Sequence, residues 1–204
     1  MLRITRLCRE KVNCFLSGGI DSAVSCAVLK ELNFDVQPVF VKNWSVLEET
    51  GICQADEDLK SAKKVVEVLG VENKIEVIDA VKPYWNDVFE PFTSAAKMGH
   101  SLNPDILCNE RIKFDVWRNI LALRGLQGIC ATGHYLLNQK YDVRYDINLN
   151  PSLTSSGDSI EKADDENKCQ LWFLSRVKPE ILKNTIFPLA LVFSNPKLYF
   201  NYFF

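Results

Sequence analysis

Short apolar runs alternate with longer amphipathic segments along the first two thirds of the chain. The apolar runs are bounded by polar residues or glycine, as is typical of buried strands, and they cover residues 12–16, 36–41, 74–78 and 128–132. Apolar residues recur at three- and four-residue spacing, which predicts helices, in residues 21–32, 56–69, 83–97 and 106–124. Strands that alternate with helices predict an α/β fold with a doubly wound, mostly parallel sheet.

This alternation ends after Tyr135. Residues 138–167 are rich in Asn, Asp, Ser and Gly, which predicts a long loop or a hairpin with partial disorder. A segment with the composition of packed structure returns at residues 170–189. Residues 193–204 hold six aromatic side chains without the boundary signals of a helix or strand, so we expect an aberrant aromatic tail there.

Charge and hydrophobicity narrow the classes of partner. The formal net charge of −2 excludes a histone-like nucleic-acid binder. Residues 1–110 carry about −5 and residues 111–204 about +3, so a local basic patch is expected in the second part. No apolar run approaches the roughly 18 residues that a membrane helix needs, and no membrane partner is expected.

The seven cysteines form no CxxC pair and none stands at zinc-finger spacing. We therefore expect no metal site built from them, and free thiols in a reducing compartment. Four of them fall in or beside predicted elements and are predicted to be structural, namely Cys14, Cys26, Cys53 and Cys130.

The segment Ser17-Gly18-Gly19-Ile20-Asp21-Ser22 lies between the first predicted strand and the first predicted helix. Glycines allow the backbone to curl around an anion with its N–H groups inward, and the helix start adds a positive dipole end. The Asp21 carboxylate would repel phosphate unless Mg²⁺ bridged them, so the loop predicts ATP with Mg²⁺. The alternative is a glycine-rich turn that only caps the helix, which the order of strand, motif and helix disfavours.

Further polar motifs follow in order along the chain. They are Lys42-Asn43-Trp44 with Gly51-Ile52-Cys53, Asn103-Pro104-Asp105-Ile106-Leu107-Cys108-Asn109 with Ile112-Lys113-Phe114, Ala131-Thr132-Gly133-His134-Tyr135, and Lys168-Cys169-Gln170-Leu171-Trp172-Phe173-Leu174-Ser175. Together with the loop they closely resemble the tRNA-specific 2-thiouridylases, which belong to the PP-loop ATP pyrophosphatase superfamily. Residues 185–189, Thr-Ile-Phe-Pro-Leu, resemble the mitochondrial branch.

The resemblance implies a Rossmann-like fold of the HUP type and a defined reaction. Adenylation makes the C2 oxygen of the wobble uridine a leaving group, and persulfide sulfur replaces it to give 2-thiouridine. The implied partners are tRNA and a persulfide donor of the sulfur-relay or cysteine-desulfurase type. The implied ATP-binding residues are Phe15, Leu16, Ser17, Gly18, Gly19, Ile20, Asp21, Ser22, Val41 (through its backbone, at the adenine) and Gly133. The implied tRNA-binding residues are Asn103, Pro104, Asp105, His134, Lys168 and Gln170.

Two residues are implied to be catalytic. Cys108 matches the first cysteine of the family's pair, in which one cysteine carries the persulfide and the second resolves the linkage as a disulfide. Its place near a helix start leads us to expect a lowered pKa. Asp105 is expected to act as general acid/base or to orient the uridine.

The chain also departs from the family. Cys169 replaces the aspartate expected between Lys168 and Gln170, and no residue matches the persulfide cysteine, which the family holds in a Gly-x-Cys segment beyond Leu189. We therefore expect a C-terminally truncated chain that keeps ATP binding and adenylation but does not complete sulfur transfer alone. An inactive or regulatory ATP- or tRNA-binding copy is one alternative. An amide-forming PP-loop ligase is another, although amide formation needs no thiolate.

These expectations divide the chain into four parts. Residues 1–137 form a nucleotide-binding catalytic domain, 138–167 a flexible loop or hairpin, 168–192 the start of a short, incomplete tRNA-binding extension, and 193–204 the tail. The branch resemblance and the Arg-rich first nine residues indicate a mitochondrial location.

Overall fold

A computed structural model describes residues 2–3, 10–44, 54–116, 119, 122–125, 128–145, 151–163 and 166–190. The predicted aromatic tail, most of the Arg-rich start and the motif Gly51-Ile52-Cys53 lie outside these residues. No helix in the described part is both long enough and apolar enough to cross a membrane.

The predicted parallel sheet is confirmed, with five strands in the order β10-β5-β2-β3-β4. Every neighbouring pair in it is parallel. The strands are β2 (Lys11–Phe15), β3 (Asp35–Lys42), β4 (Glu76–Asp79), β5 (Ile129–Ala131) and β10 (Thr185–Ile186). The edge strand β10 comes from the segment that we expected to begin an extension, so that segment contributes to the parallel sheet itself.

Alternate strand residues face two hydrophobic layers. Val12 and Cys14 of β2 join the layer built with helices α1 (Ile20–Glu31) and α3 (Gln54–Val68). Residues of opposite parity, such as Val39 of β3 and Cys130 of β5, join a second layer with Phe114 and the segment after residue 170. Period-two alternation sends successive side chains to opposite faces, so the sheet is covered on both sides. The three described cysteines that were predicted to be structural, Cys14, Cys26 and Cys130, are buried there.

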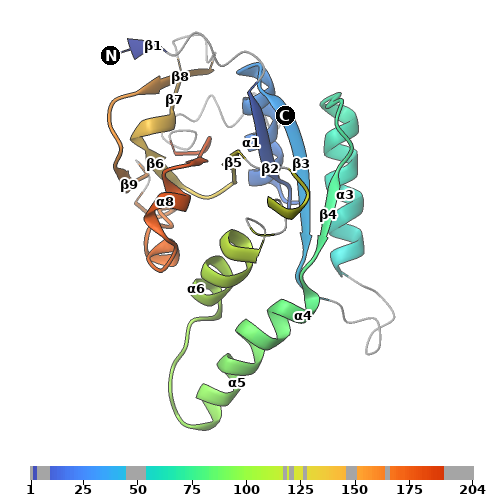
Figure 1. Cartoon of the computed structure of the whole chain (residues 1–204), viewed down its shortest axis with the longest axis vertical. Coiled ribbons are helices and arrows are strands. Elements are labelled where there is room, and N and C mark those ends of the chain that lie inside the picture. The colour runs from blue at the N-terminus through green and yellow to red at the C-terminus, as the bar shows by residue number, and fades with distance from the viewer. Residues whose placement is uncertain are drawn as a thin grey trace.

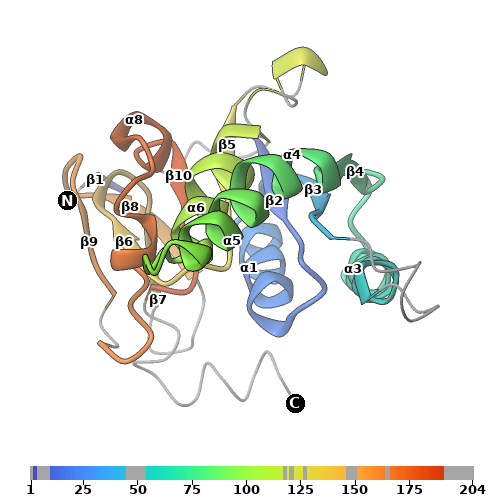
Figure 2. The same cartoon turned by 90° about the horizontal axis from the view of Figure 1, so that it is seen from below.

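A helical hairpin projects beyond the carboxyl ends of the strands (Figure 1). Its first arm is α4 (Val81–Tyr84), a π-helical stretch (Trp85–Phe89) and α5 (Glu90–Lys97). Its second arm is α6 (Pro104–Cys108), which continues into a π-helical stretch over Asn109–Val116. Figure 2, viewed from below, shows α4, α5 and α6 in front of the sheet and α1 and α3 on one side of it.

The segment predicted as a loop or hairpin contains paired strands. Strands β7 (Asp142–Tyr145) and β8 (Pro151–Ser155) pair antiparallel, and β1 (Leu2–Arg3) pairs with β8. Strands β6 (Leu136–Asn138) and β9 (Ile160–Lys162) form a second antiparallel pair. Buried Asn138 ties β6 to the segment before β10, since its Nδ2 donates to the carbonyls of Leu182 at 3.0 Å and Thr185 at 2.7 Å. Helix α8 (Pro179–Leu182) precedes β10.

Candidate functional site

A cavity of about 230 Å³ opens at the carboxyl ends of β2, β3 and β5. In open parallel sheets, ligands bind at this edge, outside the ends of the strands. The lining residues are Phe15, Leu16, Ser17, Asp21, Ser22, Val39, Val41, Asn43, Lys113, Thr132, Gly133, His134 and Gln170. The cavity therefore brings together much of the predicted ATP-binding set with His134 and Gln170, which we expected to contact tRNA.

The loop after β2 has the geometry of an anion site. Helix α1 starts at Ile20 behind Gly19, and no side chain caps its first N–H groups. The Ser22 hydroxyl donates to the Gly19 carbonyl at 2.8 Å and accepts the Ser17 N–H at 3.2 Å, which closes the loop. Uncapped N–H groups and the helix dipole favour a bound anion at this position.

Two glycines permit close approaches around the loop. Gly18 has φ +85°, and a Cβ on it would lie 2.5 Å from the Asp58 carbonyl oxygen of α3. A Cβ on Gly133 would lie 3.0 Å from the Asp21 carbonyl carbon. The loop after β5 therefore packs directly on the start of α1, which only a residue without a side chain allows at this distance.

Tyr135 joins this second loop to the loop after β2, residues 17–22, which is called the phosphate loop below. Its buried hydroxyl donates to Asp21 Oδ1 at 2.6 Å. Gln170 holds the backbone of Tyr135 through two hydrogen bonds. Its side-chain Oε1 accepts the Tyr135 N–H at 3.1 Å, and its backbone N–H donates to the Tyr135 carbonyl at 3.1 Å. Gln170, predicted to contact tRNA, thus lies in the cavity wall and positions Tyr135.

Replacing Tyr135 by Phe is expected to weaken Mg²⁺-nucleotide binding about 3- to 10-fold, because a hydrogen bond to a charged group that holds the carboxylate in place is lost. Titration with a fluorescent ATP analogue measures this. Tyr141→Phe serves as control, since its ring lies outside the cavity. An unchanged affinity in Tyr135→Phe would mean that Asp21 is oriented without the phenol.

His134 forms part of the cavity wall as a neutral imidazole. Burial, with the Lys113 charge as a second cause, lowers the pKa of His134 to about 3. Thr132 Oγ1 lies 2.8 Å from His134 Nδ1 and accepts the His134 N–H at 3.3 Å. In the tautomer in which the Thr132 hydroxyl donates to Nδ1, the imidazole proton lies on Nε2, and His134 can then donate a hydrogen bond to a ligand at neutral pH.

This His134 pKa makes folding sensitive to acid. The unfolded chain binds a proton at His134 below about pH 6.5, whereas the folded chain stays neutral there until about pH 3. Protonation therefore favours the unfolded state in this window, and stability falls as the pH drops. Between pH 7 and pH 5 the loss from this group is expected to reach about 2 kcal/mol. Urea unfolding at both pH values should show a smaller loss in His134→Asn, and an identical loss would contradict the assignment.

The catalytic pair predicted on the helical hairpin is placed outside the cavity lining. Asn103 caps α6, with Oδ1 accepting the N–H groups of Asp105 at 2.9 Å and Ile106 at 3.3 Å, and Pro104 occupies the first turn. Asp105 is exposed at this helix start, whereas Cys108 is only 7% exposed. Lys168 is exposed on another segment. None of these residues lines the cavity.

The expected low pKa of Cys108 is wrong. Burial raises the pKa of its thiol, Asp105 raises it further, and only the Lys113 charge opposes them. Cys108 lies in the second turn of a continuous helix and packs among Leu107, Ile112 and Ala80, so desolvation outweighs the dipole of the helix start.

Four residues of the cavity wall had no role in the sequence-based prediction. They are Val39, Asn43, Lys113 and Thr132. Each belongs to a predicted strand or to a motif that was recognised, but the direction of its side chain depends on packing between distant segments. Asn43 lines the cavity, and its Oδ1 is buried without a hydrogen-bond partner among the described residues. Among the described residues, no group of three or more His, Cys, Asp or Glu side chains is placed to hold a metal ion.

Similarity to known proteins covers most of the chain. The mitochondrial tRNA-specific 2-thiouridylase 1 of Rattus norvegicus is 38% identical over 189 residues, which are 88% of this chain and 42% of that protein. The tRNA-specific 2-thiouridylase of Lactococcus lactis is 38% identical over 175 residues, 86% of this chain and 43% of that protein. The chain thus spans less than half the length of these curated relatives.

A solved structure is also similar, at 17% identity. It is the crystal structure of a predicted subunit of tRNA methyltransferase from Methanocaldococcus jannaschii, with a TM-score of 0.44 over 94% of this chain and 73% of that one. The family described as tRNA methyl transferase HUP domain matches residues 10–195. The chain therefore belongs to the tRNA methyl transferase HUP domain family.

Proposed function

We propose that this chain is the uridine-activating part of a tRNA 2-thiouridylase, which uses ATP to adenylate the C2 oxygen of the wobble uridine. The observation that carries the proposal is the cavity in which an uncapped helix start, the Asp21 carboxylate and the neutral His134 converge. The names of the curated relatives support the substrate, tRNA, and the product, 2-thiouridine.

The residues present fit ATP with Mg²⁺. The loop N–H groups and the start of α1 would bind the phosphates, and Val39 and Val41 offer an apolar wall for the adenine. Mg²⁺ is usually held by one or two carboxylates together with substrate phosphates, and Asp21 supplies one carboxylate. The ion would neutralise charge on the phosphates. Asp21 keeps one oxygen beyond the Tyr135 bond for that contact.

During adenylation, the uridine oxygen attacks the α-phosphate of ATP, an O–P bond forms and pyrophosphate leaves. The protein's part is to hold the two reactants in line and to stabilise negative charge. His134 would donate from Nε2 to a phosphate or uridine oxygen without changing its own charge. Asp105, exposed at the start of α6, is our candidate for orienting the base.

Sulfur transfer is the second half of the proposed reaction. A persulfide anion attacks C2, a C–S bond forms and AMP leaves with the oxygen. The thiol of Cys108 would then attack the bridging sulfur of the carrier cysteine, releasing 2-thiouridine and leaving a disulfide that an external thiol must reduce. The persulfide would come from a sulfur-relay or cysteine-desulfurase type of donor.

Two other enzyme functions fit the cavity less well, whereas a binding copy without turnover would share its geometry. Methyl transfer, which the family's description names, uses a sulfonium donor without phosphates at the reacting centre and leaves the anion site without a role. An amide-forming ligase has no use for the Cys108 thiol. An ATP- or tRNA-binding copy without turnover differs only in the rate of the reaction.

One assay separates these functions. The purified chain is mixed with ATP, Mg²⁺ and unmodified tRNA, and pyrophosphate release is measured with tRNAs that carry uridine or cytidine at the wobble position. We expect release that requires the uridine. Binding of ATP and tRNA without release would support a binding copy, and release with an amine and no tRNA would support a ligase.

We also propose a mitochondrial location. The rat relative is named as mitochondrial, and a bacterial relative matches equally well. Fusion of residues 1–30 to a fluorescent protein tests whether the Arg-rich start directs import, and a diffuse signal would count against this address.

A further inference from the structure

Lys113 is a cation placed between the nucleotide cavity and the Cys108 thiol. It lines the cavity together with His134 and Asn43. No ion pair of Lys113 is found within the described part of the chain, and its side chain is only partly exposed. A partly buried cation without an acidic partner, beside an anion-binding loop, favours an anionic ligand.

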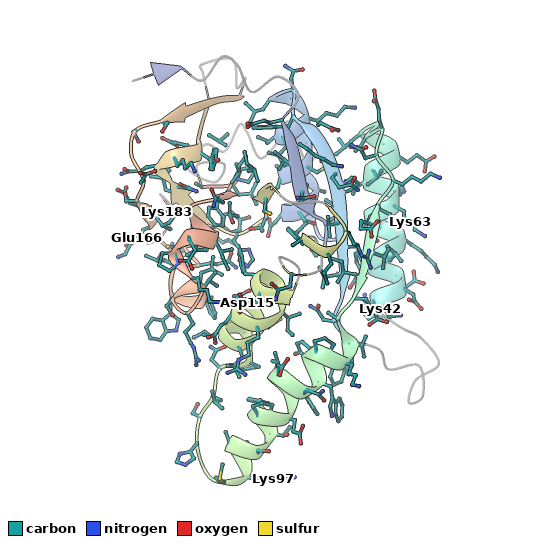
Figure 3. All side chains as sticks on the ribbon, in the orientation of Figure 1. Lys42, Lys63, Lys97, Asp115, Glu166 and Lys183 are labelled. Atoms are coloured by element: carbon teal, nitrogen blue, oxygen red, sulfur yellow. The ribbon has the colours of Figure 1, made fainter. Side chains whose placement is uncertain are left out.

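The π-helical stretch that follows α6 explains how one helix carries both the Cys108 thiol and a lysine that lines the cavity. Cys108 ends α6 and Lys113 lies five residues later, inside the π-helical segment Asn109–Val116. In an α-helix of 3.6 residues per turn, residues five apart point about 140° away from each other. A π-helix joins residues five apart through its hydrogen bonds, which brings Lys113 toward the side of the helix that carries Cys108. Figure 3 labels Asp115, which lies two residues after Lys113 and so marks this part of the helix for the reader.

The electrostatics agree with this arrangement. The charge of Lys113 lowers the pKa of Cys108 from one side and that of His134 from the other. The other titratable groups around the thiol are Asp105, which raises its pKa, and Tyr84, whose own pKa the thiol raises. Lys113 is thus the group that favours a thiolate at Cys108, against burial.

We propose that Lys113 is a catalytic residue that connects the two halves of the site: its ammonium binds a phosphate of the nucleotide, and after that anion leaves it stabilises the thiolate of Cys108. The phosphate contact rests on the proposed function, whereas the electrostatic effect on the thiol does not. Because one ammonium serves two anions, the thiol stays protonated while the nucleotide is bound. The Cys108 thiol therefore becomes a reactive thiolate only after the nucleotide anion has left.

Alkylation of Cys108 tests the thiol half without any nucleotide. Iodoacetamide labelling of the Cys108 peptide is followed by mass spectrometry as a function of pH, in wild type, Lys113→Met and Lys113→Arg. We expect the midpoint of the profile to rise in Lys113→Met, with labelling at pH 7.5 about 3- to 10-fold slower, and to return in Lys113→Arg. Arg111→Met is the matched control, because Arg111 lies on the same helix but outside the cavity lining.

A titration with an ATP analogue tests the nucleotide half. Lys113→Met should weaken binding about 10-fold, and bound nucleotide should raise the labelling midpoint of Cys108 more in wild type than in Lys113→Met. Equal midpoints in wild type and Lys113→Met, with normal thermal melting, would overturn the coupling even if ATP binds. Failure of the wild type to bind ATP, with the midpoint shift intact, would instead overturn the proposed function and the phosphate contact.

Discussion

Replacing Asp21 by Asn is expected to reduce tRNA-dependent pyrophosphate release by at least about 100-fold, the scale seen when a charge-stabilising group at a reacting centre is removed. The amide oxygen of Asn can still accept the Tyr135 hydroxyl, which lies 2.6 Å from Asp21 Oδ1. The substitution therefore removes the negative charge and keeps the hydrogen bond and the volume. Single-turnover measurement of pyrophosphate across a range of Mg²⁺ concentrations detects the change.

A surface carboxylate controls for the change in net charge. Asp158 is exposed in the segment between β8 and β9, away from the cavity lining, so Asp158→Asn should release pyrophosphate as wild type does. If Asp21→Asn kept the wild-type rate and the wild-type Mg²⁺ dependence, the carboxylate would have no part in holding the metal nucleotide. Its role would then be limited to the contact between the two loops.

The second large effect concerns Gly18. Its φ of +85° lies in the region that favours glycine, and a Cβ would meet the Asp58 carbonyl oxygen at 2.5 Å. Gly18→Ala must therefore move the phosphate loop away from α3 or shift the start of α3. We expect a loss of more than about 2 kcal/mol in the free energy of unfolding, since a steric clash adds to backbone strain. We also expect at least about tenfold weaker ATP binding, because the N–H groups that face the anion are displaced.

Gly99 offers a matched control for the backbone strain. It has φ +77°, and a Cβ on it would meet no atom within 4 Å. Gly99→Ala should therefore cost only about 1 kcal/mol, the strain of a left-handed residue, and should leave ATP binding unchanged. Urea unfolding and ATP titration of both variants separate strain from clash. Equal losses of stability, with normal ATP binding in both, would mean that the loop tolerates displacement.

The sequence alone determined four of the five strands of the parallel sheet and the place of the phosphate loop. The residues of β2 and β3 carry their own apolar runs, and the glycines between β2 and α1 allow the positive φ that the turn adopts at Gly18. Helix α3 could be predicted from the sequence equally well, because its apolar positions recur at helical spacing in residues 56–69. These features depend on neighbours within a few residues, which a linear pattern records.

Tertiary structure decided the rest. The strand β10 is two residues long and exists because Thr185 and Ile186 pair with β5, 55 residues earlier in the chain. Gln170 and His134 face the nucleotide cavity because loops distant in sequence pack on the start of α1, where Gly133 permits the contact. Burial of Cys108 reversed the pKa expected from its place near a helix start, since desolvation depends on what packs around the thiol. Local pattern fixes which residues form an element, whereas side-chain environment is a property of the assembled fold, and the chemistry of this site depends on that environment.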